Sequence, residues 1–472
     1  MAAKTTDARL LALIVACGML MAQLDGAVVT LALPAMASAF GTTAVQVSVG
    51  ITSYFLIQVI LLPAAGWISD RFGARAVFAS AVAVFTIASV LCALSPTLRL
   101  FVAARILQGA AAAMMVPVGR IALIQSTAKQ DLVRVMTITT VPMLLAPSLG
   151  PALGGFITAY WSWRWIFLLN VPFGIAGTAL AWYLIPASQQ QRPRPFDTVG
   201  FVLLGGASAL VLHSLERLAS DYPHWLAPMC LMGAGMAVAA VAVRRAWRHP
   251  HPLVSLAATR ISSFSITVFG GGSLIRVPLR ALPYLLPLMC QLALGMNALR
   301  AGVLLLALNG GDLTLKSIAT LTLRRFGFRN VLLVTALVSA LSLAACAAFS
   351  LHTPYAVIFA VLAISGMMRS LLFTGMSTLT FADIQQDAIG SASIIWNMVL
   401  QAGNSLAVSV SAVLLAASAQ LGGEAPGQLS LRDFRVAFLV MAVIGLASLP
   451  SLRRLPADAG AHVSGHRRTP AG

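Results

Sequence analysis

The sequence predicts an all-α integral membrane protein, and three observations support this fold class. Of the 472 residues, 59% are hydrophobic and only 9% are charged, whereas soluble domains carry about 25% charged residues. The apolar residues form blocks of about 20, the length of helix that crosses roughly 30 Å of hydrocarbon. Basic residues lie mostly in short loops between these blocks, so the net charge of +18 indicates membrane topology rather than nucleic-acid binding.

Polar breaks divide the chain into fourteen apolar blocks, each long enough for one membrane-spanning helix. The predicted spans lie near residues 10–34, 47–69, 76–95, 98–124, 135–159, 165–186, 197–216, 224–243, 264–292, 299–321, 330–350, 353–381, 389–419 and 435–451. No alternating ten-residue pattern indicates a β-barrel, so we expect each span to satisfy its backbone hydrogen bonds as a helix. The first block lacks a convincing cleavage site, and we expect it to remain as the first span.

The loops alternate between rich and poor in basic residues. Nineteen Lys and Arg residues lie in loops on the side of the termini, and six lie in the opposite loops: Arg99, Arg164, Arg217, Arg300, Arg432 and Arg435. Because basic loops stay in the cytoplasm, both termini are predicted to be cytoplasmic. The remaining basic residues lie within the predicted spans: Arg105, Arg120, Arg276, Arg280, Lys316 and Arg369. A charge inside a span is costly, and it marks a protein interior or a watery cavity.

A six-residue motif follows the second span and occurs again after the tenth. It is Asp70-Arg71-Phe72-Gly73-Ala74-Arg75 in the first copy and Arg324-Arg325-Phe326-Gly327-Phe328-Arg329 in the second, with four of six positions identical. Each copy predicts a tight cytoplasmic turn between two helices. Two halves related by duplication are typical of secondary transporters, whose substrate site lies between the halves near the bilayer midplane.

Five stretches carry a resemblance to a known family. They are residues 24–34 (LDGAVVTLALP), 66–75 (GWISDRFGAR), 105–109 (RILQG), 150–155 (GPALGG) and 163–172 (WRWIFLLNVP). In order and spacing they resemble the signatures of the major facilitator superfamily, in particular its fourteen-span drug:proton antiporter branch, the EmrB/QacA-type exporters. Residues 116–120 and the region of Arg276 look closest to the MdtD-like exporters of that branch.

This resemblance implies the major facilitator fold, with two six-helix bundles and two additional transmembrane helices between them. The expected domains are an N-terminal bundle at residues 1–190, two additional helices and a linker at 191–260, a C-terminal bundle at 261–455 and a cytoplasmic tail at 456–472.

Asp25 and Arg105 are the predicted proton-coupling residues. Asp25 lies about fifteen residues into the first span and Arg105 about seven residues into the antiparallel fourth span, so at 1.5 Å per residue their depths are comparable. Burial favours the protonated carboxyl group and a nearby cation favours the ionised one, so such an Asp can bind and release a proton. The resemblance also ties Arg105 to proton coupling. The alternative for each residue is a structural charge that holds helices together.

The loop after the second span provides a predicted cytoplasmic latch of Gly66, Asp70, Arg71, Gly73 and Arg75. Asp70 can accept hydrogen bonds from a neighbouring helix N-terminus and pair with an Arg in one conformational state. Gly73 allows the tight turn. The alternative is a solvated charged loop.

The fifth span is a predicted gating helix that contains Pro147, Gly150, Pro151, Gly154 and Gly155. Small residues let helices approach closely, and prolines interrupt the backbone hydrogen bonds, so this segment can bend or slide against a partner. Ordinary packing of small residues is the alternative.

The second half has its own embedded charges. Arg276 and Arg280 are one turn apart in the ninth span, and Asp312 lies at a similar depth in the tenth, so we predict that Asp312 pairs with one of these arginines. The pair is either switchable or permanently structural. Six embedded basic residues against two acidic ones favour neutral, amphipathic or anionic substrates over permanent cations.

No nucleophile, metal-ligand or nucleotide-binding motif accompanies the spans, so we expect neither an enzyme nor a cofactor or metal, and no ATP-driven pump. The sequence predicts a proton-coupled exporter of amphipathic small molecules or drugs that works by alternating access in a bacterial-type inner membrane. Its expected partners are a small-molecule substrate, protons and the lipid bilayer, and neither nucleic acid nor nucleotide. The alternatives are export of an endogenous metabolite or organic anion, and a non-transporting membrane sensor.

Overall fold

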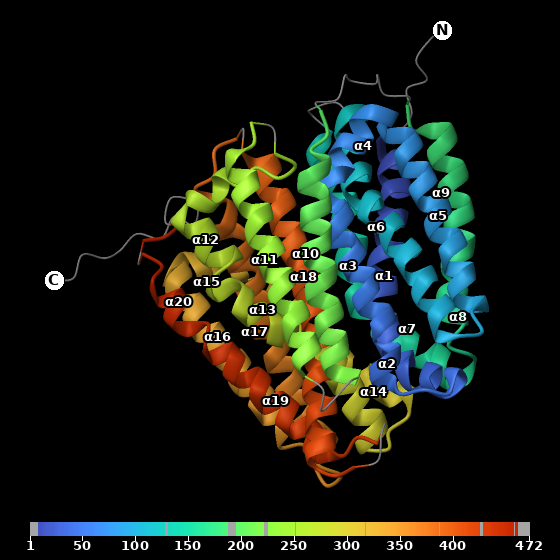
Figure 1. Cartoon of the computed structure of the whole chain (residues 1–472), viewed down its shortest axis with the longest axis vertical. Helices are drawn as coiled ribbons and strands as arrows, with labels where there is room; N and C mark the ends of the chain where they lie inside the picture. Colours follow the sequence, from blue (N-terminus) through green and yellow to red (C-terminus); the bar gives the residue numbers. More distant parts are fainter. Residues whose placement is uncertain are drawn as a thin grey trace, which may run out of the picture. The chain divides into compact units, whose positions relative to one another are not determined.

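The computed structural model of the chain consists of helices joined by short connections (Figure 1). The structure describes residues 8–127, 131–186, 195–220, 225–250, 252–316, 318–386, 388–424, 428–456 and 458–460. Within these ranges every regular element is a helix, which confirms the all-α class. Several predictions lie outside the described residues: the loop charges Lys4, Lys129, Arg192, Arg194, Arg467 and Arg468, the first domain boundary at 190, and most of the predicted tail at 456–472.

The chain divides into two compact units, and each is described by itself. Unit 1 comprises Met1–His213 and Cys230–Leu253, and unit 2 comprises Ser214–Met229 and Val254–Gly472. The helices that begin in unit 1 are α1 (Ala8–Phe40), α2 (Ala44–Val47), α3 (Val49–Leu61), α4 (Ala65–Phe72), α5 (Ala74–Leu94), α6 (Leu98–Ser126), α7 (Leu132–Tyr160), α8 (Trp165–Leu168), α9 (Asn170–Leu184) and α10 (Thr198–Ser220).

The helices that begin in unit 2 are α11 (Leu226–Arg248), α12 (Ser262–Val268), α13 (Gly271–Leu288), α14 (Ala298–Lys316), α15 (Ala319–Phe326), α16 (Phe328–Ala347), α17 (Tyr355–Ala382), α18 (Ile389–Leu421), α19 (Leu431–Leu446) and α20 (Leu449–Arg453). Short 3-10 segments lie at Leu62–Ala64 and Ala257–Arg260, and a π-helical turn at Met289–Ala293 continues α13. The predicted division into two bundles, an intervening pair of helices and a tail stays a prediction.

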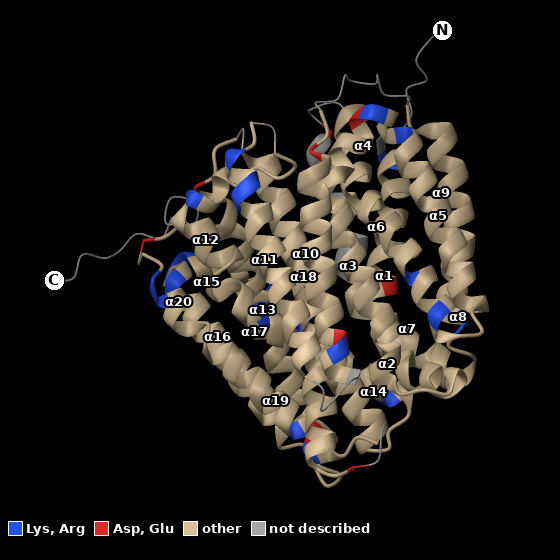
Figure 2. Ribbon diagram, in the orientation of Figure 1, with Lys and Arg blue, Asp and Glu red and all other residues tan. Residues whose placement is uncertain are grey.

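Thirteen helical segments of the described chain are long and apolar enough to cross a membrane. The 29-residue helix α7 coincides with the remaining predicted span at 135–159. Lys and Arg (blue) and Asp and Glu (red) gather towards helix ends, with long uncharged stretches between them (Figure 2). A charge at the centre of a membrane helix costs about 2.5–3.5 kcal/mol, so this distribution suits a multi-pass membrane protein. Which side the termini face stays a prediction.

Two of the helix ends that differ from their predicted positions have a clear local cause. α1 continues through Pro34 and ends at Phe40, because Gly41, with φ +64°, reverses the chain there. The proline is tolerated in the helix, so the predicted end at 34 is wrong. α19 begins at Leu431 rather than near 435, because the side chains of Ser430 and Asp433 form a capping box at its start.

Both copies of the repeated motif form tight turns. Gly73 joins α4 to α5 with φ +84°, and Gly327 joins α15 to α16 with φ +74°. Each glycine N–H donates to the carbonyl of the residue four positions earlier, at 2.8 Å and 3.0 Å respectively. A side chain is strained at such positive φ values, so glycine is required at both turns.

The ring of Phe78 on α5 fills the space between α1 and α6 in the core of unit 1. An added Cβ on Gly18 of α1 would lie 3.1 Å from this ring, and one on Gly119 of α6 would lie 2.9 Å from it. Asp25 follows Gly18 by two helical turns and therefore lies on the same face of α1. The packing around Phe78 thus directs the Asp25 face towards α6.

Candidate functional site: a buried charge network

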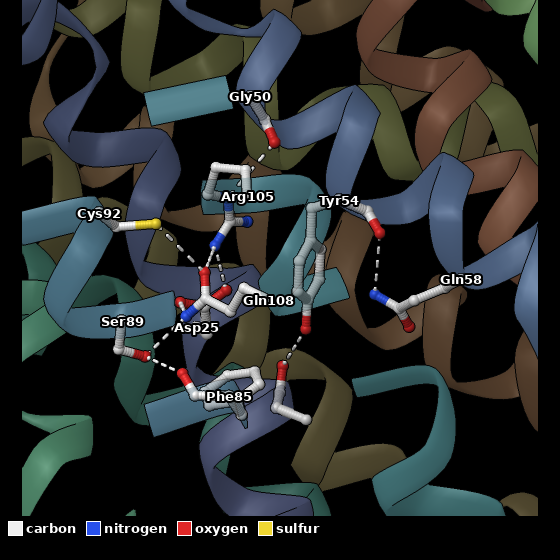
Figure 3. Close-up of polar contacts among 10 residues, drawn as sticks. Asp25, Gly50, Tyr54, Gln58, Phe85, Ser89, Cys92, Arg105 and Gln108 are labelled. Carbon is white, nitrogen blue, oxygen red and sulfur yellow. Dashed lines mark hydrogen bonds and ion pairs between the residues drawn. The ribbon is translucent and has the colours of Figure 1, made fainter. Parts of the chain in front are cut away.

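Asp25 on α1 and Arg105 on α6 form an ion pair inside unit 1 (Figure 3). Arg105 Nη1 lies 2.5 Å from Asp25 Oδ2, and both side chains have no exposed surface. The structure therefore brings together the two residues of the predicted coupling site. Hydrogen bonds to the other polar atoms of the two side chains offset the cost of burying such a pair, and Arg105 Nη2 is the atom of this pair that lacks one among the described residues.

Gln108 completes the network from one turn further along α6 (Figure 3). Its Nε2 atom donates to Asp25 Oδ1 at 3.0 Å and to Ser89 Oγ on α5 at 2.9 Å. Its Oε1 atom accepts from Arg105 Nη1 at 2.5 Å. Both carboxylate oxygens of Asp25 therefore accept a hydrogen bond. The sequence analysis missed Gln108, although its spacing of three from Arg105 places both on one face of the helix.

Helix α3 holds Arg105 independently of Asp25. Arg105 Nε donates to the carbonyl oxygen of Gly50 at 3.3 Å, and its guanidinium lies 4.2 Å from the ring centroid of Tyr54. The hydroxyl of Tyr54 donates to the carbonyl of Ala22 on α1 at 3.2 Å. The guanidinium thus has a backbone acceptor and an aromatic face in addition to its carboxylate partner, and cation–π contacts of this kind are attractive.

Close packing of α3 against α6 makes these contacts possible. An added Cβ on Gly109 would overlap the carbonyl oxygen of Tyr54, and one on Gly50 would lie 2.5 Å from the ring of Phe101. Glycine at both positions lets the two helices approach until Arg105 reaches α3. The RILQG stretch at residues 105–109 therefore contributes the cation, the bridging amide and the close contact.

The predicted gating helix α7 packs along α1 beside Asp25. An added Cβ on Gly150 would lie 2.9 Å from Ala27 Cβ, and one on Gly154 would lie 2.9 Å from the carbonyl oxygen of Val28. The residues of α1 at this contact, Ala27 and Val28, closely follow Asp25. The other predicted gating residues lie in the same continuous helix: Pro147, Pro151 and Gly155. Their gating role stays a prediction.

The charged residues of the predicted latch lie at the turn between α4 and α5. The Arg71 guanidinium lies 5.8 Å from the ring centroid of Trp67, and that of Arg75 lies 5.3 Å from the ring of Trp182 on α9. Asp70 is exposed and forms no ion pair with another described residue. The structure therefore shows aromatic partners for the arginines, and a latch role for Asp70 stays a prediction.

The two glycines of the predicted latch differ in their surroundings. Gly73 has the positive φ described above. An added Cβ on Gly66 would meet no atom within 4 Å. Of these two glycines, only Gly73 has a backbone conformation that requires glycine.

In unit 2, Asp312 on α14 pairs with Arg369 on α17. Arg369 Nη2 lies 2.9 Å from Asp312 Oδ2 and donates to Asn309 Oδ1 at 3.0 Å. The prediction that Asp312 pairs with Arg276 or Arg280 is wrong for this structure. Similar depth along two spans does not determine which way a side chain points around the helix axis.

Two glycines explain why Asp312 turns towards α17. An added Cβ on Gly366 of α17 would overlap the carbonyl oxygen of Leu308, and one on Gly311 of α14 would overlap that of Ala363. The two helices are therefore packed backbone to backbone at this level. Asp312 follows Gly311 directly and lies beside the α17 cation.

Arg276 and Arg280 lie on α13 without a carboxylate partner among the described residues. The Arg276 guanidinium lies 4.2 Å from the ring centroid of Trp396 on α18, and its Nη1 atom donates to the carbonyl of Val268 at 3.4 Å. Arg276 is 5% exposed. Arg280, one turn further on, is exposed and interacts electrostatically with Asp312.

A further ion pair lies at the start of α10. Arg245 Nη2 on α11 lies 2.9 Å from Asp197 Oδ1, which also accepts from the N–H of Gly200 at 2.9 Å. Burial alone opposes ionisation of Asp197, but the hydrogen bonds from Gly200 and Arg245 outweigh it and lower the pKa of Asp197 below its ordinary value. This carboxylate therefore caps α10 and joins it to α11.

Metal ligands are not grouped in the described part of the chain. No three His, Cys, Asp or Glu side chains lie close enough there to hold an ion. The five cysteines are free, and three of them are buried.

The sequence of this chain has a clear match among protein families. Residues 15–408 match the Major Facilitator Superfamily. The chain belongs to this superfamily. Membership accounts for the ordered signatures in the sequence.

Curated relatives of this superfamily member carry the name "Putative multidrug resistance protein MdtD". The chain is 35% identical over 448 residues to the protein from Citrobacter koseri, with 94% of each chain covered. It is 36% identical over 453 residues to that from Cronobacter sakazakii, again with 94% of each covered. It is 36% identical over 461 residues to that from Serratia proteamaculans, covering 94% of this chain and 93% of the relative.

Solved structures confirm the major facilitator fold at low sequence identity. A D-xylose-proton symporter superposes with a TM-score of 0.67 at 16% identity, covering 96% of this chain and 98% of the symporter. A bacterial homologue of the human lysosomal transporter Spinster gives 0.66 at 12% identity, with 100% of both chains covered. The human organic anion transporter MFSD10 gives 0.57 at 14% identity, covering 94% and 99%.

Proposed function

We propose that this superfamily member is a proton-coupled exporter of amphipathic small molecules that works by alternating access in a bacterial-type inner membrane, with both termini in the cytoplasm. Its membership in a transporter superfamily and the names of its relatives support export. The observation that carries proton coupling is the fully buried pair of Asp25 and Arg105, because an intramembrane carboxylate next to a cation changes partner when it binds a proton.

The contacts of Asp25 and Arg105 indicate that Asp25, rather than Arg105, changes position when the pair breaks. Arg105 keeps a backbone acceptor on Gly50 and the ring of Tyr54 when its carboxylate partner is lost. Ionised Asp25 is held to α6 by one hydrogen bond to each carboxylate oxygen, from Arg105 and from Gln108, and protonation removes the ionic attraction to Arg105. Protonation of Asp25 therefore weakens the contact between α1 and α6 and leaves Arg105 in position.

The energies involved favour protonation of Asp25 over separation of the ionised Asp25–Arg105 pair. Breaking a buried ion pair by removing one partner costs about 3–5 kcal/mol. One proton that moves across 100 mV supplies about 2.3 kcal/mol. A conformational cycle that neutralises Asp25 before the helices part needs less energy than one that pulls ionised partners into hydrocarbon.

The close contact between α1 and α7 carries this change to the gating helix. Gly154 lies against the backbone of Val28, so α1 cannot shift at Asp25 without moving α7. In the proposed cycle a proton from outside binds Asp25, the α1–α6 contact loosens, and substrate is released outwards. Release of the proton to the cytoplasm restores the pair and the inward-facing state. The Asp70 latch acts at the cytoplasmic turn between α4 and α5, and the Asp312–Arg369 pair acts within unit 2.

The test measures flux into proteoliposomes under an imposed pH gradient for wild type and Asp25→Asn. The probes share one apolar body and differ in charge: 2-naphthamide, 2-naphthylmethylammonium and 2-naphthoate. We expect gradient-driven flux of at least one probe in wild type, and its loss in Asp25→Asn with equilibrium binding of that probe retained. Protein-free liposomes measure the leak of each probe.

Asp131→Asn is the matched control, because it removes the same charge from an exposed loop residue. It should transport as wild type does. Equal gradient-driven flux in wild type and Asp25→Asn would assign Asp25 to structure and direct the search for the coupling acid to Asp312. Flux that is insensitive to the gradient in every variant would contradict antiport.

A second candidate is export of an endogenous metabolite or organic anion. It is favoured by Arg276 and Arg280, two embedded cations that lack a carboxylate partner among the described residues. The three probes distinguish this candidate from export of neutral or cationic drugs, because only an anion exporter prefers 2-naphthoate.

A further inference from the structure

Arg276 is a buried cation with one face already covered. It is 5% exposed, and its guanidinium lies 4.2 Å from the ring centroid of Trp396. Within the described ranges no carboxylate neutralises it. A buried charge needs a hydrogen-bonded partner of opposite sign, so this arrangement is incomplete as a structural ion pair.

The free hydrogen-bond donors of Arg276 lie on one edge of its guanidinium. Nη1 donates to the carbonyl of Val268 at 3.4 Å. Nε and Nη2 are buried and have no acceptor among the described residues. These two atoms share the side edge of the planar group, which is the edge that binds both oxygens of a carboxylate through parallel hydrogen bonds.

The charges around this edge also favour an anion. Arg280 interacts electrostatically with Arg276 from one turn away on α13, and with Arg369 on α17. Asp312 is the acidic member of this group, and it is already paired with Arg369 at 2.9 Å. Three arginines and one aspartate leave a positive potential that attracts a negatively charged ligand.

An aromatic cluster that includes Trp396 adjoins Arg276. The ring of Trp396 lies 6.2 Å from that of Phe373 and 6.1 Å from that of Phe381, measured between centroids. Phe373 is 38% exposed and lies one turn after Arg369 on α17. Aromatic rings of this kind offer apolar contact area to a ligand whose charged end is held elsewhere.

We infer that Arg276, stacked on Trp396, binds the carboxylate of an amphipathic organic anion, and that the apolar part of the anion lies against Trp396 and Phe373. Nε and Nη2 each donate one hydrogen bond to the carboxylate. Arg280 contributes longer-range attraction. This inference rests on the exporter function proposed above and assigns its substrate class, since a carboxylate gives each donor its own oxygen and neutralises the buried charge, and a neutral or cationic compound does not neutralise it.

The test is equilibrium binding of three probes to the full-length protein in lipid nanodiscs, with no gradient applied. The probes are 2-naphthoate, 2-naphthamide and 2-naphthylmethylammonium, and protein-free nanodiscs give the partition background. Hydrogen bonds to charged groups support at least about a tenfold difference in affinity. We therefore expect 2-naphthoate to bind about tenfold or more tightly than 2-naphthamide, and the ammonium compound to bind most weakly.

Two variants locate the preference. Arg276→Gln removes the charge, and Arg276→Lys keeps the charge but lacks the two-donor edge. Both should reduce the preference for 2-naphthoate over 2-naphthamide to about threefold or less. Arg300→Gln, which removes an exposed arginine at the start of α14, is the matched control and should retain the wild-type preference.

The outcomes separate this inference from proton coupling. Asp25→Asn should bind 2-naphthoate as wild type does even though its gradient-driven flux is lost, because Asp25 belongs to unit 1 and Arg276 to unit 2. Equal affinity of wild type for 2-naphthoate and 2-naphthamide overturns the anion site whether or not the variants fold. Unchanged preference in Arg276→Lys and Arg276→Gln overturns the assignment to Arg276.

Discussion

The amide of Gln108 joins three helices at the Asp25–Arg105 pair. From α6 it donates to Asp25 on α1 and to Ser89 on α5, and it accepts from Arg105 on its own helix. A side-chain amide has both donors and an acceptor, so it can satisfy a carboxylate and a guanidinium at once. Gln108 therefore fixes the distance between the two charges without adding a charge of its own.

Substitution of Gln108 should destabilise the protein at this point. Gln108→Leu leaves the Oδ1 atom of Asp25 without its donor in a fully buried site, and a buried unsatisfied polar group costs about 1–3 kcal/mol. We expect a lower thermal denaturation temperature in detergent, measured by loss of monodisperse protein after heating. Gln420→Leu, at an exposed position on α18, is the control and should denature close to the wild-type temperature. Equal temperatures for Gln108→Leu and wild type would show that the network contributes no stability.

Asp197 gives a prediction about pH. Its pKa in the folded protein is lowered by hydrogen bonds from Gly200 and Arg245, with His249 adding to the attraction, against the opposing effect of burial. A carboxylate with a lowered folded pKa contributes stability above its ordinary pKa of about 3.9, and this stability is lost as the pH falls through the lowered value.

Asp197→Asn should therefore lower the denaturation temperature at pH 7, by the equivalent of about 1 kcal/mol. The difference from wild type should shrink as the pH falls towards about 3. The measurement is a series of denaturation temperatures from pH 8 to the lowest pH at which both proteins stay soluble. Asp131→Asn serves as control. A gap between wild type and Asp197→Asn that widens on acidification would contradict the assigned direction.

Residue depths could be predicted from the sequence, and residue directions could not. Counting 1.5 Å per residue from the ends of two spans was enough to bring Asp25 and Arg105 together. The same arithmetic failed for Asp312, because its partner depends on rotation about the α14 axis. That rotation is determined by the contact of Gly311 and Gly366, whose small size is visible in the sequence but whose pairing is not.

At the scale of elements, the contact between α1 and α7 depends on two glycines that leave little space. An added Cβ on Gly154 would lie 2.9 Å from the carbonyl oxygen of Val28, and backbone atoms at such a distance cannot yield as a flexible side chain can. Overpacking a close contact typically costs about 1–3 kcal/mol. This contact is the one that links the gating helix to Asp25.

Gly154→Val should consequently push α7 away from α1, lowering both the denaturation temperature and the rate of gradient-driven flux. Gly206→Val on α10 is the matched control, because an added Cβ there meets no atom within 4 Å, and it should leave both quantities near wild type. If Gly154→Val equals its control in stability and flux, the glycine contact does not couple the two helices.

The existence of each long helix followed from apolar block length, while helix ends depended on local chemistry. The predicted end of α1 at 34 assumed that a proline stops a helix, yet the helix continues to Phe40 and Gly41 ends it. The start of α19 was placed too late because the capping pair of Ser430 and Asp433 was not considered. In both cases the residues that determine the helix end are visible in the sequence, but the predicted end followed the limits of the hydrophobic block instead.

For the whole molecule, the distribution of basic loops predicts the orientation in the membrane. In a cysteine-free background, a cysteine introduced at Arg325 should react with a membrane-impermeant maleimide only after the cells are permeabilised. A cysteine introduced at Arg300 should react in intact cells. Both positions are exposed in the structure. Labelling of Arg325→Cys in intact cells, with Arg300→Cys protected, would invert the topology.

Composition and periodicity predict the class of fold because a membrane leaves few solutions for the backbone. The choice of substrate is different, since it depends on side chains such as Arg276 and Trp396 that come from α13 and α18 and meet only in the folded unit. The sequence places Arg276 within a predicted span but does not show that Trp396 lies against it. What the sequence does show about the substrate is that basic residues outnumber acidic residues within the predicted spans.

The three ion pairs described above each lie within a single unit: Asp25 with Arg105 and Asp197 with Arg245 in unit 1, and Asp312 with Arg369 in unit 2. During synthesis at the ribosome, the N-terminal part of the chain can therefore neutralise its embedded carboxylates before the C-terminal part has been made. Quality-control proteases that recognise unpaired charges in the bilayer then find the carboxylates of the N-terminal part already paired. A gene cut near residue 253 should, on this basis, yield two fragments that each survive in the membrane when expressed together.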